Sequence, residues 1–317
     1  WLLEPEQPTV RYLALRDLVG ARGPELEEAR LAIMGAGPVP RILDRQEPEG
    51  HWGRPEDFYV RSKYRGTVWN LILLADLCAD PADKRVRRAC EFVLRWSQDR
   101  SSGGFSYRGT GERGGTHSGV LSCLTGNMVF SLIRLGHLED ERVASGLDWL
   151  TRYMRFSLEP MGTREWPFSN PRCWGRHTCR SGAVKALKAL AEVPAPRRTP
   201  AMRRCIEEGA EFLLRMNIVG EREGGLEVKR PEWLQLGFPR MWSTDILEIL
   251  DILTRLGYQD ERMHRALGLL LGKRQPDGRW LQEDRYHGRY LISFGANGRP
   301  GKWTTLMAMR VLQAMPR

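Results

Sequence analysis

Apolar positions gather along the chain in five runs that are hydrophobic nearly all round. Their starts fall roughly 55 to 65 residues apart, a period that is typical of paired helices. A helix that is apolar on every side is expected to be buried between its neighbours. We therefore predict inner helices over the runs Thr67–Ala79, Val120–Leu135, Ser181–Ala191, Ser243–Leu256 and Trp303–Ala314.

A more polar run follows each of the first four apolar runs after a short break. These runs carry Asp or Thr near the start and apolar residues at spacings of three and four, which predicts amphipathic outer helices. The predicted outer helices are Lys84–Trp96, Asp140–Tyr153, Thr199–Met216 and Asp260–Lys273. Upstream, Pro8–Val19 together with Glu25–Met34 and Pro38–Arg45 supplies a sixth pair.

Six inner helices surrounded by six outer ones make a closed all-α barrel, an α/α toroid, and we predict one such domain over residues 1–317. An open solenoid is the alternative, although a fixed handful of repeats with atypical ends favours closure. The long connections all precede inner helices. We therefore expect function at the inner-helix N-termini, where free backbone N–H groups favour anions.

Charge narrows the choice of ligand only slightly. The net charge of +10, from 49 Lys and Arg against 39 Asp and Glu, suits an anionic small molecule or a peripheral contact with an acidic membrane surface. An Arg-rich solvated surface explains it equally well. No run of five or six basic residues stands apart, so we do not expect a nucleic-acid partner.

Cysteine usage and hydropathy indicate a compartment. Six cysteines are few for 317 residues and lack the dense spacing of a disulfide-rich secreted domain, so we expect reduced thiols and a cytoplasmic protein. No apolar stretch reaches the length of a membrane span, and the acidic opening is unlike a signal peptide. Cys78, Cys90 and Cys205 lie on predicted helical faces and are expected to fill core gaps.

Two loops carry a Gln, Gly and Trp signature, Gln46–Gly53 and Gln275–Trp280, and Ser101–Tyr107 is a weaker copy. The signature resembles the repeats of the terpenoid cyclase and protein prenyltransferase superfamily, whose members are α/α toroids. The resemblance therefore implies the same fold as the helix pattern. We expect Trp52 and Trp280 to serve the scaffold, because the aromatic ring packs on the neighbouring outer helix.

The stretch His177-Thr178-Cys179 is similar to the His-Thr-Cys opening of an inner helix in prenyltransferase β subunits, where that His binds the catalytic zinc. The Asp-x-Cys pair that completes the zinc site in those enzymes has no counterpart here. Cys123 is expected at the same depth on the neighbouring inner helix, and Cys173 on the adjoining loop. We predict a zinc site of Cys123, Cys173, His177 and Cys179, a set that suits tetrahedral zinc. Thiols that merely fill gaps between helices are the alternative.

Other polar and aromatic side chains lie at or just before the predicted inner-helix starts. Candidate catalytic residues are His117, Asp245 and Glu248, although Asp245 is expected above all to cap its own helix. No Asp-x-Asp-Asp motif is present, which counts against the acid chemistry of class II terpene cyclases. Candidate substrate-binding residues are Tyr64, Trp69, Asn127, Arg240, Trp242, Lys302 and Trp303.

By resemblance, the leading hypothesis is a zinc-dependent enzyme that acts on an isoprenoid or another large apolar substrate in a central cavity. The metal would activate a thiol or water. The alternative is a non-catalytic ligand-binding or scaffold toroid in which four protein ligands make the zinc structural.

Overall fold

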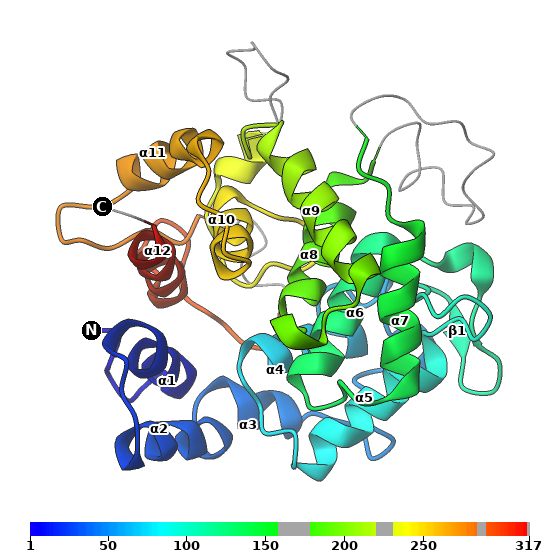
Figure 1. Ribbon diagram of the computed structural model, residues 1–317. Helices are drawn as coiled ribbons and strands as arrows, with labels where there is room; N and C mark the ends of the chain where they lie inside the picture. Colours follow the sequence, from blue (N-terminus) through cyan, green and yellow to red (C-terminus); the bar gives the residue numbers. More distant parts are fainter. Residues whose placement is uncertain (158–177, 220–230, 284–289, 316–317) are drawn as a thin grey trace. The chain divides into compact units, whose positions relative to one another are not determined.

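The computed structural model describes residues 1–157, 178–219, 231–283 and 290–315 (Figure 1). In these residues the only strands are β1 (Gly109–Thr110) and β2 (Gly114–Gly115), which form one short antiparallel hairpin. The all-α prediction is confirmed. Contacts divide the chain into a middle unit, Ile42–Phe212, and an end unit made of Trp1–Arg41 and Leu213–Arg317.

The predicted inner helices are present. In the middle unit they are α4 (Thr67–Asp76), α6 (Ser122–Arg134) and α8 (Arg180–Ala191), and in the end unit α10 (Ile246–Arg255) and α12 (Lys302–Ala314). Every residue of α6 from Ser122 to Ile133 is buried, including its few small polar residues, as expected for a helix that is largely apolar on every side. α10 begins three residues later than predicted, because Asp245 lies outside the helix and caps it.

The outer helices are α5 (Lys84–Trp96), α7 (Glu141–Tyr153), α9 (Pro200–Leu214) and α11 (His264–Gly272). The aspartates predicted near their starts are N-caps. Asp83 and Asp140 accept hydrogen bonds at 2.7 and 2.9 Å from the backbone N–H groups of Arg85 and Arg142, two residues on. Each cap satisfies a donor that the first turn would otherwise leave without a partner.

The predicted sixth pair is formed by α1 (Pro8–Ala14), continued by a π-helical turn over Leu15–Val19, with α2 (Pro24–Gly35) and α3 (Pro38–Leu43). Within the end unit α1 packs on α2 and α12, and α12 packs on α10. Closure of the ring involves both units and stays a prediction, as does the single domain. The 3₁₀ turns are Pro55–Asp57, His117–Gly119, Ala195–Arg197, Pro231–Leu234 and Glu261–Met263.

The inner helices of the middle unit run parallel. Ser122 in the first turn of α6 contacts Gly182 in the first turn of α8, and one turn later Gly126 lies against Lys185. At the other end, Lys188 of α8 lies 3.1 Å from Asp76 at the end of α4. The N-terminal ends of α4, α6 and α8 therefore lie at one end of this unit.

The Gln and Trp loops attach to the helices on either side of them. The Gln46 amide donates to the carbonyl of Arg85 in the first turn of α5, at 2.9 Å. The Trp52 indole donates back to the carbonyl of Ile42, and its backbone N–H donates to the hydroxyl of Thr67 in the first turn of α4. This confirms the prediction that Trp52 serves the scaffold.

The other copies repeat these bonds. The backbone N–H of Phe105 donates to Thr125 at 2.9 Å, and that of Trp280 donates to Thr305 at 3.0 Å. The Trp280 indole donates to the carbonyl of Leu270, ten residues earlier, as Trp52 does to Ile42. A threonine in the first turn of an inner helix is thus part of the repeat, in addition to the Gln, Gly and Trp positions.

Candidate functional site

Two of the predicted zinc ligands lie on neighbouring first turns in the middle unit. Cys123 follows Ser122, which contacts Gly182, and Cys179 is the N-cap of α8. The Cys179 sulfur accepts the N–H of Gly182 at 3.4 Å. Cys123 is 7% exposed and Cys179 is half-buried, and neither forms a disulfide. The parallel packing of α6 and α8 thus brings both thiols to the same end of the unit.

The other two predicted ligands, Cys173 and His177, lie outside the described residues. Within the described ranges, no three His, Cys, Asp or Glu side chains are grouped as a metal site would require. Tetrahedral zinc is commonly bound by cysteine thiolates and histidine nitrogens. Cys123 and Cys179 would supply two of the three thiolates of the predicted set. The four-ligand set stays a prediction.

An aromatic cluster precedes and begins α4 in the same unit. The Trp69 ring stacks on Tyr59 at 4.6 Å between centroids, and Tyr64 meets it edge-on at 5.0 Å. All three side chains are buried, and the Trp69 indole donates to the carbonyl of Tyr59. The candidate Asn127 is 2% exposed, one turn along α6 from Cys123.

His117 is paired with a carboxylate that the sequence analysis missed. Its Nδ1 lies 2.8 Å from Asp99, whose side chain is 7% exposed. Burial opposes the charge of Asp99, but hydrogen bonds from Ser102, His117 and Ser101 outweigh it and hold its pKa below the usual value. The spacing of 18 residues gave no signal, because only the folded loop brings the pair together. An imidazole held in this way by a carboxylate can act as a base through its other nitrogen.

Asp245, in the end unit, is a buried cap with a charged partner. It accepts the N–H of Glu248 at 2.7 Å and that of Gly237 at 3.1 Å, and its carboxylate lies 2.6 Å from Arg240. Full burial raises the pKa of Asp245, against the opposing effect of Arg240. Arg240 also donates to the carbonyl of Gln235, and Glu248 is 3% exposed. The expectation that Asp245 caps its own helix is confirmed.

Aromatic rings from before and after Asp245 in the chain meet in the end unit. Phe238 stacks on Trp303 at 4.0 Å between centroids with 7° between the planes, and Phe294 meets Phe238 edge-on at 5.2 Å. Trp303 is 4% exposed, in the first turn of α12. The candidate Lys302 pairs with Glu4 at 2.7 Å, and Trp242 is half-buried. These groups and Asp245 all belong to the end unit.

Charged groups also meet at the C-terminal ends of α4, α6 and α8, where no site was expected. Lys188 pairs with Asp76, and its ammonium lies 4.0 Å from the centroid of the Phe130 ring. Arg134 donates to the sulfur of Cys78 at 3.1 Å. The Cys78 sulfur thus accepts a hydrogen bond and does more than fill a gap in the core. Burial raises the pKa of Cys90 and of Cys205 to about 12, as expected for thiols in a core.

No protein-family model matches the chain, and no curated protein is similar to it. A solved protein from Actinoplanes is 18% identical over 97% of this chain and 89% of its own, with a TM-score of 0.45. A variant of the type II terpene cyclase MstE from Scytonema, in complex with merosterolic acid A, is 16% identical over 98% of this chain and 86% of its own, also at 0.45.

Another MstE variant, solved with its substrate geranylgeranyl dihydroxybenzoate, is 16% identical over 98% of this chain and 87% of its own, with a TM-score of 0.43. At these values the likeness is distant and assigns no residue a role. In the described part of the chain, no helix combines the length and apolarity that a membrane crossing needs.

Proposed function

We propose that the chain is a zinc-dependent enzyme of the terpenoid cyclase and prenyltransferase type, acting on an isoprenoid or another large apolar substrate. One observation supports this most strongly. The parallel packing of α4, α6 and α8 gathers the thiols of Cys123 and Cys179 and the aromatic side chains of Tyr64 and Trp69 at one end of the middle unit.

The chemistry follows from these groups. Zinc held by Cys123 and Cys179, with Cys173 and His177, would act as a Lewis acid or activate a thiol or water, provided that one coordination position stays open. Aromatic side chains favour apolar chains and stabilise cationic centres through their ring faces. The proposal therefore pairs a metal centre with an aromatic cluster that is buried beside it.

Metal content tests the zinc part. Protein purified without added metal is expected to contain one equivalent of zinc by elemental mass spectrometry, and Cys123→Ala and Cys179→Ala to lose most of it. Cys205→Ala is the matched control, because this thiol is also buried but lies in α9. Absence of zinc from the unmodified protein would refute the proposed metal site.

Substrate binding is tested separately with geranylgeranyl diphosphate and with geranylgeraniol, by calorimetry on the zinc-containing protein. Saturable binding of either would support the substrate class. We expect Trp69→Ala to weaken that binding, with loss of fold excluded by circular dichroism. Failure of both ligands to bind would refute the isoprenoid assignment even if zinc is present.

A second candidate is a non-catalytic toroid with a structural zinc. The observation that favours it is the engagement of several candidate groups in packing: Trp69 is stacked on Tyr59, and Asp245 is a cap bound to Arg240. Under this alternative, removing zinc with a chelator would unfold the chain. The enzyme proposal instead expects a folded, inactive protein.

A further inference from the structure

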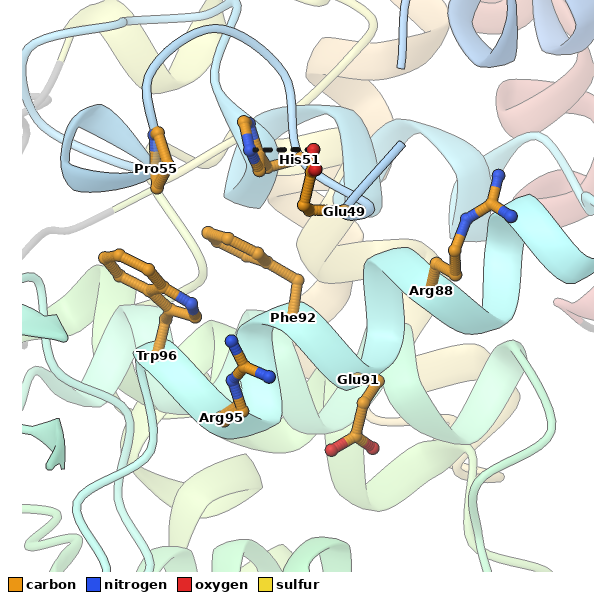
Figure 2. Close-up of a pocket in the computed structure, with 8 residues that line it drawn as sticks. All are labelled: Glu49, His51, Pro55, Arg88, Glu91, Phe92, Arg95 and Trp96. Atoms are coloured by element: carbon orange, nitrogen blue, oxygen red, sulfur yellow. Dashed lines mark ion pairs between the residues drawn. The ribbon is translucent and has the colours of Figure 1, made fainter. Parts of the chain in front are cut away.

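A pocket of about 310 Å³ lies between α5 and the loop that carries the first Gln and Trp signature (Figure 2). Aromatic rings form one part of its wall and charged side chains another. Phe92 and Trp96 stack at 5.1 Å between centroids with 12° between the planes, and the His51 ring lies 5.2 Å from Phe92. Pro55 lines the same space. The pocket is inside the middle unit and separate from the proposed zinc site.

His51 gives this wall a buried polar group. The residue is 7% exposed, and its Nδ1 has no hydrogen-bond partner among the described residues. Its Nε2 lies 3.9 Å from the carboxylate of Glu49, a side chain that is mostly exposed. A buried ring nitrogen with no partner is uncommon in folded proteins, so the His51 ring is an unusual choice for this position.

Two arginines supply positive charge. Arg88 and Arg95 line the pocket, and in the described part of the chain neither forms an ion pair or a side-chain hydrogen bond. Figure 2 shows the Arg95 side chain on the same side of α5 as the rings of Phe92 and Trp96. Unpaired guanidinium groups beside aromatic faces favour a ligand that is both flat and anionic.

The acidic residues of the pocket do not cancel this charge. Glu91 points to the opposite side of α5 in Figure 2 and forms a bidentate pair with Arg142, both N–O distances being 2.9 Å. Only Glu49 is left to oppose an anion, and it lies at the exposed edge, beside His51. The lining therefore has more free positive than free negative charge.

The second copy of the repeat has different side chains at the positions that line the pocket in the first copy. Gly50 packs against the backbone of Arg88 in the first copy, and Gly103 packs against Ser145 in the second. On that alignment Trp149 stands where Phe92 does, and Gly104 stands where His51 does. A Cβ on Gly104 would lie 2.6 Å from Nε1 of Trp149, so the larger ring needs a glycine opposite it.

From these contacts we infer that the pocket binds a small organic anion with a flat aromatic body. The body lies against Phe92, Trp96 and Pro55. The anionic group is held by Arg95, Arg88 adds positive charge farther along α5, and the His51 ring closes the wall. The volume suits a bicyclic ring and is at the lower end of the range for small-molecule pockets.

The probes are naphthoate and its neutral counterpart naphthyl methanol, titrated into the full chain by calorimetry. Naphthoate is expected to bind saturably to one site, and at least about tenfold more tightly than the alcohol, because charge-assisted bonds to arginine are lost in the neutral probe. Equal binding of the two probes, or no saturable binding of naphthoate, would overturn the proposal.

Variants locate the site. Arg95→Gln is expected to weaken naphthoate binding by about tenfold, and Glu49→Gln to strengthen it severalfold, because each changes one charge beside the anion. Arg87→Gln is the matched control: it makes the same charge change on α5, outside this pocket. If Arg87→Gln weakens binding as much as Arg95→Gln, only general surface charge is involved and the proposal is wrong.

The last test replaces the pocket side chains of the first copy with those of the second. The double variant Phe92→Trp with His51→Gly copies the second repeat and is expected to abolish naphthoate binding while the helical circular dichroism signal is kept. Retained binding in the folded double variant would contradict the proposed site. Should this variant fail to fold, the comparison of Arg95→Gln with Arg87→Gln still decides, because both side chains are exposed.

Discussion

Asp245 and Arg240 form a buried ion pair, with 2.6 Å between carboxylate and guanidinium and side-chain exposures of 1% and 7%. Asp260 and Arg262 form a similar pair at 2.8 Å, with exposures of 25% and 34%. Both aspartates are N-caps with an arginine partner. They differ in burial, and burial decides what the loss of the negative charge costs.

We expect Asp245→Asn to lower the free energy of unfolding by about 3–5 kcal/mol, because it removes the negative charge that faces the buried Arg240 guanidinium. Asp260→Asn, the control, is expected to cost about 0–1 kcal/mol, since its arginine returns to water. Urea unfolding at neutral pH measures both changes. Equal costs for the two variants would show that the Asp245 pair is more solvated than its burial indicates.

Asp99 should make stability depend on pH. Its folded-state pKa lies below the ordinary 3.8, so the bonds from Ser102, His117 and Ser101 stabilise the fold above that pH and are lost as the pH falls through the folded value. Asp99→Asn is therefore expected to cost about 1–3 kcal/mol near neutral pH and less in acid.

Unfolding curves of the native chain and of Asp99→Asn at several pH values between about 7 and 3 measure this difference. The exposed Asp277, which accepts the N–H of Arg279, provides the control Asp277→Asn. A difference between the native chain and Asp99→Asn that does not change with pH would contradict a depressed pKa for Asp99.

Gly126 sets the closest approach of α6 and α8. A Cβ at this position would lie 2.5 Å from the backbone carbon of Lys185, and backbone cannot move aside as a side chain can. We expect Gly126→Ala to destabilise the chain by about 1–3 kcal/mol.

Gly268 in α11 is the control, because nothing lies within 4 Å of an added Cβ there. Gly268→Ala should stabilise the chain by about 0.5–1 kcal/mol through helix propensity. Thermal unfolding of both variants measures whether each substitution raises or lowers the stability of the chain. A gain of stability in Gly126→Ala would mean that the two helices are free to separate.

Thr67 holds the first signature loop through its hydroxyl, which accepts the N–H of Trp52 at 3.2 Å. Thr67→Val keeps the shape but leaves that buried N–H without an acceptor, at a cost of about 1–3 kcal/mol. Thr151 is half-buried and its hydroxyl donates only to a carbonyl of its own helix, that of Asp148, so Thr151→Val is expected to change stability by less than about 0.5 kcal/mol. Hydrogen exchange at the Trp52 amide should quicken in Thr67→Val only; unchanged exchange would show that another acceptor replaces the hydroxyl.

Helices could be predicted from this sequence much more fully than the site. The apolar runs that begin at Thr67 and Val120 are longer than a typical strand and contain only scattered polar residues, so their burial as helices followed directly. Asp245 was recognisable as a cap because Ser, Thr and Asp stand together before an apolar run.

The candidate site depends on contacts between loops, and the order of residues in the sequence does not show which loop residues will be in contact. Asp99 and His117 meet because the β1–β2 hairpin brings the two ends of its loop together. The pocket beside Trp96 depends on the size of Phe92 and His51 relative to Trp149 and Gly104, which becomes visible only when the copies are compared in space.

The bonds of the signature loops have a consequence for how such a chain can change. The Gln46 loop is bound to α4 and α5, which follow it, and through the Trp52 indole to Ile42 of α3, which precedes it. These bonds are made by Gln46, by Thr67 and by the backbone N–H and indole of Trp52. The side chains between the loop and the outer helix can therefore differ from copy to copy, as His51 with Phe92 differs from Gly104 with Trp149, while the bonds that join successive pairs are kept.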